Sequence, residues 1–300
     1  MAADRKVAIV TGAASGLGRA MALGLASSGM HVVAVDRDAQ ALGKLPAPGG
    51  GGSIMPLPTD LAQADVFERI PAAAVKEFGR VDVLVNNAGI GQSSVRADQR
   101  RNPIRLWEVP PEQWSRFLAV NATAPIMMAR AVVPHLLRAK WGRVVTVTTS
   151  LGTMVRGGYL LYGSSKAAAE SAMAVLAAEV EGTGVTSNVL VPGGVTNTPL
   201  VGNDAGDRAK MLQPDIMVPP LLWLVSPAAD GVNARRFVAA DWDTSLPPRE
   251  SRREGRGAHR LAGDRPDADR ADVGATCGAT PRLRGYAAPV QCAADRWTEG

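Results

Sequence analysis

Apolar residues occur along the chain in short runs, separated by longer stretches with helical spacing. Several runs are apolar throughout, which is typical of strands in a parallel sheet covered by helices on both faces. The predicted strands are Val7–Val10, Val32–Val35, Ile54–Leu57, Val81–Val85, Val144–Thr148, Val185–Val191 and Phe237–Ala240. The predicted helices are Gly16–Ser28, Ala62–Phe78, Pro111–Ala139, Leu160–Glu181 and Met217–Ser226. This alternation predicts a doubly wound α/β fold.

The predicted elements form one domain over residues 1–248. Residues 46–52, Pro-Ala-Pro-Gly-Gly-Gly-Gly, have the composition of a linker between domains. A strand and then Thr59-Asp60-Leu61 follow immediately, so we interpret this segment as a loop inside a single domain.

Residues 249–300 have a different composition. They contain four residues of the types Val, Leu, Ile, Met and Phe, namely Leu261, Val273, Leu283 and Val290. So little apolar surface does not offset the entropy of ordering the chain, and we predict a disordered tail. Because the composition changes abruptly, a further hypothesis is that this end is non-native, for example frame-shifted.

Composition and charge exclude several classes of function. The net charge of +5 is modest and the basic residues are scattered, so we expect no nucleic-acid partner. No run approaches the roughly 20 apolar residues that span a bilayer, and the first strand begins without a preceding signal-peptide pattern. We therefore expect a cytoplasmic protein without a membrane segment. The two cysteines (Cys277, Cys292) and three histidines (His31, His135, His259) have no ligand-like spacing, so no metal site is predicted.

A glycine-rich segment, Thr11-Gly12-Ala13-Ala14-Ser15-Gly16-Leu17-Gly18, lies between the first predicted strand and a helix. Glycines at such a turn let the backbone approach a pyrophosphate, whose charge the helix N-terminus stabilises. The spacing is G-x-x-x-G-x-G rather than the commoner G-x-G-x-x-G. The assignment therefore depends on the strand before the segment and the helix after it. The segment predicts a dinucleotide-binding loop.

Asp36 ends the second predicted strand, 18 residues after Gly18. An acid at about this distance binds the ribose hydroxyls of NAD and repels the 2′-phosphate of NADP. Ser15 supplies no cation to offset that repulsion, whereas Arg37, next to Asp36, is a group that accepts a phosphate. On charge grounds we expect NAD as the favoured cofactor, with NADP as the alternative.

Further motifs follow in order along the chain: Asn86-Asn87-Ala88-Gly89, Asn121 in Val-Asn-Ala-Thr, Tyr162-Gly163-Ser164-Ser165-Lys166 and Pro192-Gly193. Together with the glycine-rich segment, these motifs resemble the classical short-chain dehydrogenase/reductase (SDR) family. The resemblance extends from about Lys6 to Trp242.

The resemblance implies a single Rossmann-type domain with a seven-stranded parallel sheet. It also implies hydride transfer between a nicotinamide and an alcohol or carbonyl, in a homodimer or homotetramer. Asp60 is expected at the adenine end of the cofactor, Asn87 in structural support of the central strand, and Val195 and Thr198 near the carboxamide. The predicted cofactor-binding residues are Gly12, Ser15, Gly16, Leu17, Gly18, Asp36, Arg37, Asp60, Leu61, Asn87, Ala88, Gly89, Tyr162, Lys166, Pro192, Gly193, Val195 and Thr198.

Tyr162 and Lys166 form the predicted proton-transfer pair. A free tyrosine has a pKa near 10, which is too high for efficient exchange at neutral pH. Lys166, at i+4, projects from the same helical face, and its ammonium, together with the oxidised nicotinamide, is expected to lower the pKa of the phenol. Tyr162 then takes the proton of an alcohol or donates one to a carbonyl. Asn121 is expected to hold a water that links Lys166 to solvent.

The third catalytic group is ambiguous in the sequence. In the family a serine lies 13 residues before the tyrosine and hydrogen-bonds the reacting oxygen. Here Thr149 occupies that position and Ser150 follows it. Threonine keeps the hydroxyl but adds a methyl group and stiffens χ1. We predict Thr149 as the donor, with Ser150 as the alternative after a one-residue slip.

Two loops are expected to select the substrate, Gly91–Pro111 and Thr196–Met217. The first carries four arginines, so it is either a solvated surface loop or a basic rim that attracts an anionic substrate; these are Arg96, Arg100, Arg101 and Arg105. Candidate pocket residues are Met154, Trp107 and Tyr159. The predicted function is an NAD(P)-dependent alcohol dehydrogenase or ketoreductase. The alternatives are a nucleotide-binding sensor or scaffold with little catalysis, and an isomerase or dehydratase that uses NAD transiently.

Overall fold

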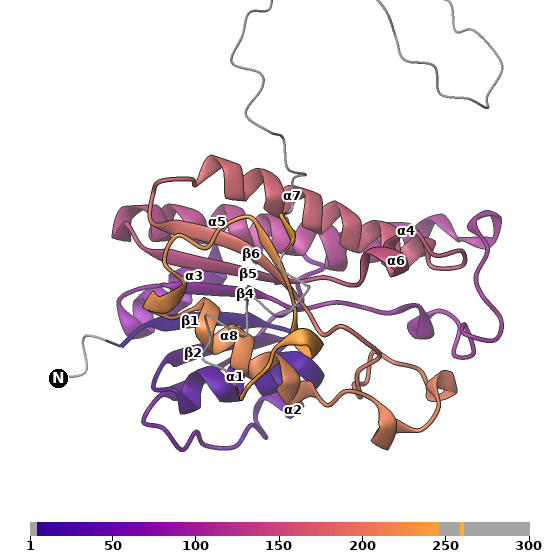
Figure 1. Ribbon diagram of the computed structural model, residues 1–300, viewed down its shortest axis with the longest axis horizontal. Helices are drawn as coiled ribbons and strands as arrows, with labels where there is room; N and C mark the ends of the chain where they lie inside the picture. Colours follow the sequence, from indigo (N-terminus) through magenta and orange to yellow (C-terminus); the bar gives the residue numbers. More distant parts are fainter. Residues whose placement is uncertain (1–4, 246–258, 261–300) are drawn as a thin grey trace, which may run out of the picture. The chain divides into compact units, whose positions relative to one another are not determined.

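The computed structural model describes residues 5–245 and 259–260, and the chain divides into two units, of which residues 1–263 form the first. Seven parallel strands form the central sheet of this unit, in the order β3-β2-β1-β4-β5-β6-β7 (Figure 1). Their bounds are Val7–Thr11 (β1), His31–Asp36 (β2), Ser53–Pro58 (β3), Val83–Asn86 (β4), Gly142–Val147 (β5), Val185–Val191 (β6) and Arg235–Val238 (β7). The predicted doubly wound parallel sheet is confirmed.

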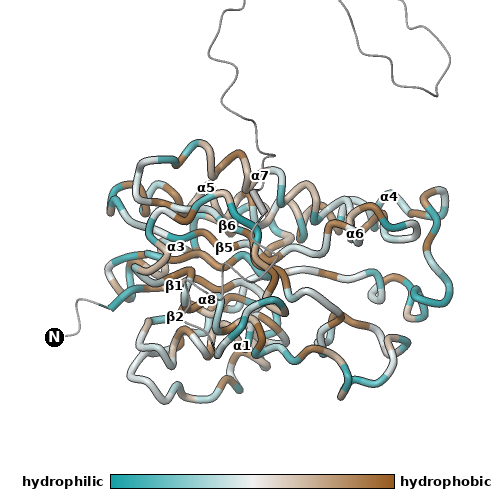
Figure 2. The backbone as a smooth tube through the Cα atoms, viewed as in Figure 1, coloured by the Kyte–Doolittle hydropathy of each residue, from teal (hydrophilic) through white to brown (hydrophobic). Residues whose placement is uncertain are grey.

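Helices cover both faces of this sheet. α1 (Gly16–Ser27) and α8 (Val218–Leu224) pack on one face, while α3 (Arg69–Phe78), α5 (Ala124–Ala139) and α7 (Ser165–Glu179) pack on the other. The strands in the middle of the sheet, β1, β4, β5 and β6, are buried along their whole length. Many of their residues are hydrophobic, as the brown stretches of the backbone in Figure 2 show. Edge strand β3 is half-exposed, which is where its two prolines are tolerated.

The strand order reverses between β1 and β4, which lie side by side but continue to opposite edges of the sheet. In open α/β sheets the ligand crevice lies at this switch point, beyond the carboxyl ends of the strands. Most of the predicted site residues follow the first six strands, β1 to β6, so the topology gathers them at this edge.

Two predicted helices begin later than expected. The prediction Ala62–Phe78 is wrong for residues 62–68, because α3 begins at Arg69. Pro71 explains the late start, since proline fits the first turn of a helix and not its interior. Similarly, α8 begins at Val218 after a 3₁₀ turn at Pro214–Met217, and prolines occupy its first turn.

The predicted helix Pro111–Ala139 is one continuous helical run with an interruption in the middle. It consists of α4 (Pro111–Leu118), a π turn at Ala119–Thr123 and α5. By length and composition this run could cross a membrane, but more than half of its most apolar part is buried inside the protein. Burial against the sheet accounts for the apolar residues, as in the core helix of a globular domain.

The predicted disordered or non-native tail, residues 249–300, falls largely outside the described residues. The described part, His259–Arg260, forms a two-residue strand (β8) that pairs antiparallel with β7. The sheet therefore has an additional short strand at its β7 edge that the sequence pattern did not predict.

Candidate active site

A cleft of about 730 Å³ runs along the carboxyl edge of the sheet. This volume lies in the usual range of ligand sites. Nearly all of the predicted site residues line it; Gly18 and Asn121 lie behind its wall. The lining residues include Gly12, Ser15, Gly16, Leu17, Asp36, Arg37, Asp60, Leu61, Asn87, Ala88, Gly89, Thr149, Ser150, Tyr162, Lys166, Pro192, Gly193, Val195 and Thr198.

The glycine-rich loop has no room for side chains at two of its glycines. A Cβ on Gly12 would lie 2.8 Å from Ala88 Cα, and one on Gly18 would lie 2.0 Å from the Gly12 carbonyl oxygen. Ser15 is the N-cap of α1, yet its side chain makes no capping hydrogen bond. The loop thus leaves backbone N–H groups, a free hydroxyl and the positive end of a helix dipole facing the cleft, which fits the pyrophosphate of a dinucleotide.

Asn87 and Thr11 join the carboxyl ends of β1 and β4. The Asn87 amide donates to the carbonyl oxygens of Thr11 (2.9 Å) and Gly12 (3.2 Å). The Thr11 hydroxyl accepts from the backbone N–H groups of Asn87 (2.9 Å) and Ala88 (3.1 Å). These contacts fix the glycine-rich loop against the segment that leads to Gly89.

Asp36 lies at the far end of the cleft. Its carboxylate accepts hydrogen bonds from the backbone N–H groups of Ala14 (3.0 Å) and Asp38 (3.1 Å). These bonds hold the carboxylate at the wall of the cleft, and Asp60 lines the same cleft from the end of β3. Arg37 is exposed beside Asp36. The site therefore combines a carboxylate held in place by hydrogen bonds, Asp36, with an exposed guanidinium, Arg37, next to it in the sequence.

Tyr162 and Asn121 both lie in π turns, at Leu160–Ser164 and Ala119–Thr123. A π turn shifts the backbone hydrogen-bond pattern by one residue and often marks a functional site. The Ser165 hydroxyl contacts the carbonyl oxygens of Leu161 (2.7 Å) and Tyr162 (3.0 Å) and accepts from the Asn121 amide (3.0 Å). One hydroxyl therefore links the two π turns.

Thr149 and Ser150 have different environments. The Thr149 side chain lies close enough to the Tyr162 phenol to lower its pKa. Ser150 is instead the N-cap of α6 (Leu151–Met154), and its hydroxyl accepts from Thr153 N (3.1 Å) and contacts Thr153 Oγ1 (2.7 Å). The geometry therefore favours Thr149 over Ser150 as the partner of Tyr162.

Burial dominates the ionisation of the catalytic pair. It raises the pKa of Tyr162 to about 12, while the nearby Thr149 side chain acts in the opposite direction. Burial also lowers the pKa of Lys166 to about 8, because desolvation disfavours the charged form of both groups. The expected lowering of the Tyr162 pKa by Lys166 and oxidised nicotinamide together stays a prediction.

Lys166 and Asn121 flank Gly89. A Cβ on Gly89 would lie 3.2 Å from both Lys166 Nζ and Asn121 Oδ1. The Lys166 ammonium donates to the Val147 carbonyl oxygen at 3.1 Å. Asn121 is held by the Ile90 backbone, with its oxygen accepting from Ile90 N (2.8 Å) and its amide donating to Ile90 O (3.0 Å). Asn121 thus fixes the loop after β4 against the π turn.

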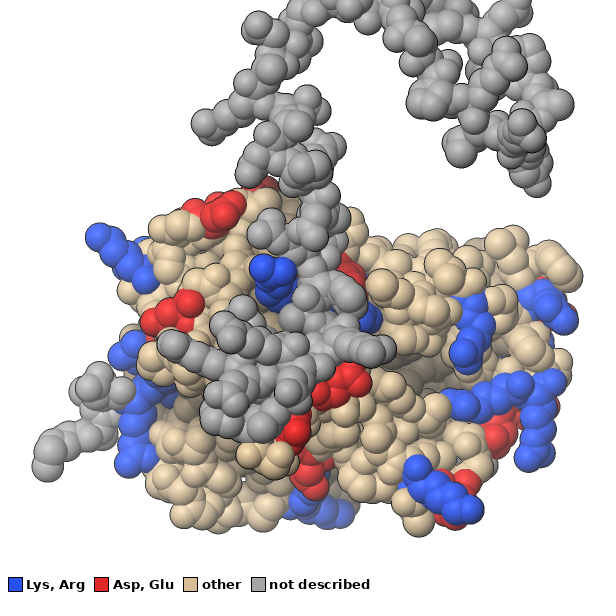
Figure 3. All heavy atoms as spheres, viewed as in Figure 1, with Lys and Arg blue, Asp and Glu red and all other residues tan. Residues whose placement is uncertain are grey.

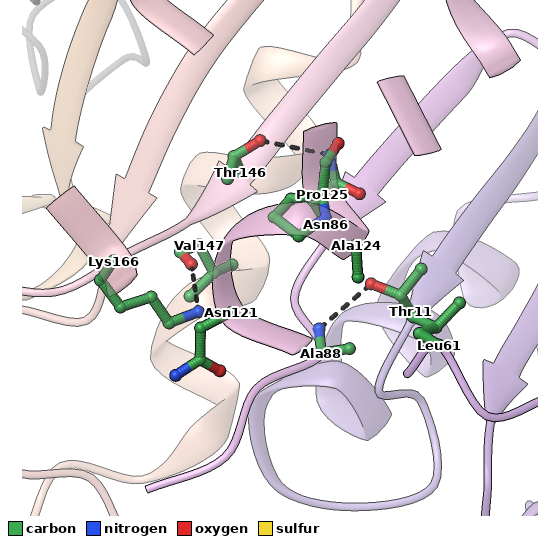
Figure 4. Close-up of a pocket in the computed structure, with 10 residues that line it drawn as sticks. All are labelled: Thr11, Leu61, Asn86, Ala88, Asn121, Ala124, Pro125, Thr146, Val147 and Lys166. Atoms are coloured by element: carbon green, nitrogen blue, oxygen red, sulfur yellow. Dashed lines mark hydrogen bonds between the residues drawn. The ribbon is translucent and has the colours of Figure 1, made fainter. Parts of the chain in front are cut away.

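A small cavity of about 10 Å³ lies behind this pair (Figure 4). Lys166 and Asn121 lie on one side of it and Thr11, Ala88 and Leu61 on the other. Its size is close to that of a single water molecule. Asn86 Oδ1, whose residue lines the cavity, is buried without a hydrogen-bond partner in the described part of the chain, so the site offers a water both space and an acceptor.

Gln92 is a site residue that sequence reasoning missed. It is buried, its amide donates to the Gly158 carbonyl oxygen (2.6 Å), and its oxygen accepts from Tyr162 N (3.2 Å). Gln92 thereby ties the loop after β4 to the backbone of Tyr162. No motif pointed to it; a polar residue directly after Gly89-Ile90-Gly91 was the available signal.

The arginines of the loop Gly91–Pro111 do not act together. Arg100 lines the cleft, whereas Arg96 is paired with Glu108 at 3.4 Å. Arg116 and Arg156, from other elements, also line the cleft. Lys and Arg side chains gather over the end of this unit that carries α4 and α6 (Figure 3).

The loop 196–217 contacts the glycine-rich loop and the loop after β4. Thr198 lies against Gly16, and the Ser93 hydroxyl donates to the Leu200 carbonyl oxygen at 2.9 Å. Among the predicted pocket residues, Tyr159 lines the cleft, while Met154 and Trp107 do not; Trp107 is exposed at the surface. Within residues 5–245 and 259–260 no cluster of potential metal ligands is present.

Comparison with known proteins places this site in a family. Residues 6–209 match the family model described as short chain dehydrogenase. A short chain dehydrogenase from Pseudocercospora fijiensis is 36% identical over 206 residues, which are 68% of this chain and 64% of that protein, so the chain spans less than two thirds of this relative. D-threitol dehydrogenase from Mycolicibacterium smegmatis is 33% identical over 78% of this chain and 91% of the relative.

The 3-oxoacyl-[acyl-carrier-protein] reductase FabG of Escherichia coli is 33% identical over 63% of this chain and 73% of the relative. Several similar solved structures contain a cofactor, and two of them illustrate the range. A metagenomic short-chain oxidoreductase in complex with NADP has a TM-score of 0.61 at 27% identity, covering 75% of this chain and 92% of that one. The 3-ketoacyl-(acyl-carrier-protein) reductase from Brucella melitensis, complexed with NADH, has a TM-score of 0.64 at 30% identity, with the same coverage.

The chain therefore belongs to the short-chain dehydrogenase/reductase family. It is an NAD(P)-dependent oxidoreductase of this family, whose relatives act on CH–OH groups and their carbonyl counterparts. The glycine-rich loop, Asn87 and the cleft give the dinucleotide a place to bind.

Proposed function

We propose that the protein transfers a hydride between a nicotinamide cofactor and a secondary alcohol or ketone, with Tyr162 as the acid and base. The placement of the Tyr162 phenol and the Thr149 hydroxyl in one cleft carries this proposal. Both groups lie at the wall of the cleft that also contains Lys166 and the glycine-rich loop. A proton donor, a second hydroxyl donor, a cation and a cofactor cradle thus share one cleft.

When bound, the nicotinamide supplies the hydride acceptor for oxidation or the hydride donor for reduction. Thr149 holds the substrate oxygen by a hydrogen bond. Tyr162 accepts the hydroxyl proton during oxidation and donates it during reduction. Because the pKa of Lys166 is about 8, its amine is mostly protonated at neutral pH, and this charge favours the phenolate form of Tyr162.

We further propose a preference for NAD over NADP. The Asp36 carboxylate lines the cleft and is held there by two backbone N–H groups. A 2′-phosphate would meet this fixed negative charge at short range, which is unfavourable. Arg37 is exposed and could turn toward a phosphate, so the preference is expected to be moderate.

The charges along the cleft support a substrate that carries a negative group. The acidic lining residues, Asp36 and Asp60, belong to the cofactor end, after β2 and β3. Arg100, Arg116 and Arg156 also line the cleft, and none of the three forms an ion pair with a carboxylate in the described part of the chain. Unpaired guanidinium groups at a cleft favour a carboxylate or phosphate.

Exposed apolar residues on two helices support a homo-oligomer. Leu137 on α5 and Val175 on α7 are 41% and 56% exposed. We propose that these helices form the interface of a homodimer or homotetramer. Light scattering of the purified protein measures the mass directly, and a monomer at micromolar concentration would refute the proposal.

The experiment that tests the main proposal is cofactor titration followed by turnover. NAD and NADP binding to the full chain is measured first, and then reduced-nicotinamide absorbance is followed with matched pairs of hydroxy-carboxylates and their methyl esters. We expect turnover, with carboxylates favoured, and a loss of about 100-fold or more in Tyr162→Phe with cofactor affinity retained. Cofactor binding without turnover of any substrate would favour a sensor or scaffold.

A further inference from the structure

A buried ion pair lies directly beneath the catalytic loop after β5. Arg236 Nε, on β7, donates to Glu170 Oε1, on α7, at 3.0 Å, and the two side chains are 7% and 11% exposed. Glu170 is one helical turn beyond Lys166, at i+4. The pair therefore connects α7, the helix that carries Lys166, with β7, the strand next to β6.

Both partners also bind the segment that carries Thr149. The other oxygen of Glu170, Oε2, accepts from the Thr148 hydroxyl at 2.5 Å. Arg236 Nη2 donates to the Thr149 carbonyl oxygen. The sheet register explains this reach, because Arg236 pairs with Val189 and Val189 with Thr146, which places Arg236 two strands from the end of β5.

Two charges taken out of water are costly, and replacing such a pair with apolar residues is often neutral or stabilising. Stability alone is therefore a weak reason for this pair. Its two additional contacts both end at Thr148 and Thr149, and neither residue is otherwise held by a regular strand or helix. The next residue, Ser150, already caps α6.

We propose that Glu170 and Arg236 are positioning residues: they hold the Thr148–Thr149 segment so that the Thr149 hydroxyl meets the Tyr162 phenol. This inference rests on the proposed function, in which that hydroxyl binds the substrate oxygen. When the ion pair is lost, Thr149 moves away from Tyr162. The phenol then loses the nearby hydroxyl that opposes the rise of its pKa.

The test compares Glu170→Gln and Thr148→Val, which remove a charge and a hydroxyl at nearly constant shape, with Asp230→Asn as a matched control. Asp230 pairs with another buried arginine, Arg143, at the amino end of β5. We expect kcat to fall about 10- to 100-fold in the first two variants, as for a small displacement of a catalytic group, with cofactor affinity unchanged. Asp230→Asn is expected to keep the wild-type kcat.

The pH profile separates positioning from general support of the fold. In the alcohol-oxidation direction, the limb that reports Tyr162 is expected to move to higher pH in Glu170→Gln and Thr148→Val, and to return in Thr148→Ser. Unchanged kcat and pH limb in both variants would overturn the inference. Should Glu170→Gln fail to fold, Thr148→Val and Thr148→Ser decide.

The proposed function fails separately from this inference. If Tyr162→Phe keeps its turnover, Tyr162 is not the acid and base. If Tyr162→Phe loses turnover while the Glu170 and Thr148 variants keep it, the proposed function stands and the positioning role is refuted. Titration of tyrosinate absorbance in the NAD-loaded protein compares the pKa of Tyr162 between wild type and the variants without a substrate. The chain has 3 tyrosines, so the titration of Tyr162→Phe is subtracted to remove the signal of the other tyrosines.

Discussion

Two buried arginines lie at opposite edges of the same sheet. Arg143, at the amino end of β5, pairs with Asp230 and stacks on the Trp141 ring at 4.2 Å, where Lys6 lies on the same ring at 3.1 Å. Arg236, near the carboxyl ends of the strands, pairs with Glu170. The chemistry of the two pairs is the same, but their surroundings differ.

The amino-edge arginine bonds elements of the fold to one another. Its guanidinium donates to the carbonyl oxygens of Gly142 (2.9 Å) and Gly184 (3.3 Å), and no predicted site residue takes part. The carboxyl-edge arginine reaches the catalytic loop. In a parallel α/β sheet the edge at which a polar cluster lies therefore indicates its role, because ligands bind beyond the carboxyl ends.

The largest effect is expected at Thr149. Thr149→Val removes the hydroxyl that lies beside Tyr162 in the cleft and keeps the shape of the side chain. Loss of one preorganised donor lowers kcat by about 100-fold, whereas Thr149→Ser should keep the donor and most of the activity. Steady-state kinetics on the best substrate of the panel measure both. Full activity of Thr149→Val would show that the polar cluster at the carboxyl edge does not act in catalysis through Thr149.

A substitution of Lys166 tests whether a functional group at the carboxyl edge lowers the stability of the folded protein. The pKa of Lys166 in the folded protein, about 8, lies below the ordinary value of 10.5. The unfolded chain then binds more protons between these two pH values, so the free energy of unfolding rises with pH across this window and the penalty is constant below it. Lys166→Met lacks the penalty and should be more stable than wild type at pH 7, by about 3 kcal/mol.

Urea unfolding of both proteins at pH 7 and near pH 10 measures this difference. We expect the advantage of Lys166→Met to shrink as the pH rises toward 10.5. An advantage that is the same at both pH values would show that burial of the ammonium is not its cause.

A substitution of Asp230 tests the contribution of the amino edge to the free energy of unfolding. Asp230→Ala leaves the Arg143 guanidinium buried without its carboxylate, which is unfavourable. Since the Asp230 side chain is 59% exposed, solvent weakens the pair, and we expect a loss of about 1–2 kcal/mol in the free energy of unfolding. Turnover at a temperature where the variant is folded should equal that of wild type. A lower kcat would show that the amino edge also affects the active site.

The smallest effect is expected at Asp36, at the cofactor end of the carboxyl edge. Asp36→Asn removes the negative charge that disfavours a 2′-phosphate, while the amide oxygen still accepts a backbone hydrogen bond. The ratio of the NAD and NADP dissociation constants should change by about tenfold toward NADP. Arg37→Gln in the same background should reverse part of this change. An unchanged ratio would refute the role given to Asp36.

Much of the fold was predictable because several of the predicted strands are apolar throughout and the helices follow at regular spacing. The ends of elements were less predictable. The predicted strand Phe237–Ala240 omitted Arg235 and Arg236, since two adjacent arginines contradict a buried strand. They fit because Arg236 has a carboxylate partner, and that partner lies 66 residues earlier in the chain.

The site shows the same division. Residues in motifs were found, because their spacing along a strand, a turn or a helix is local. The choice between Thr149 and Ser150 needed the structure, which shows that Ser150 caps α6. Gln92, Glu170 and Arg236 carry no motif, and their contacts with the catalytic segment depend on the strand order and register.

The hydroxyl of Ser165 has a consequence for how this site can change during evolution. Asn121 and Ser165 belong to different helices, yet the Asn121 amide donates to the Ser165 hydroxyl, which itself donates to the Leu161 carbonyl oxygen. A substitution of either residue alone leaves a buried donor or acceptor without its partner, which costs free energy. Across related sequences the two positions should therefore covary, so that a change at Asn121 is accompanied by one at Ser165.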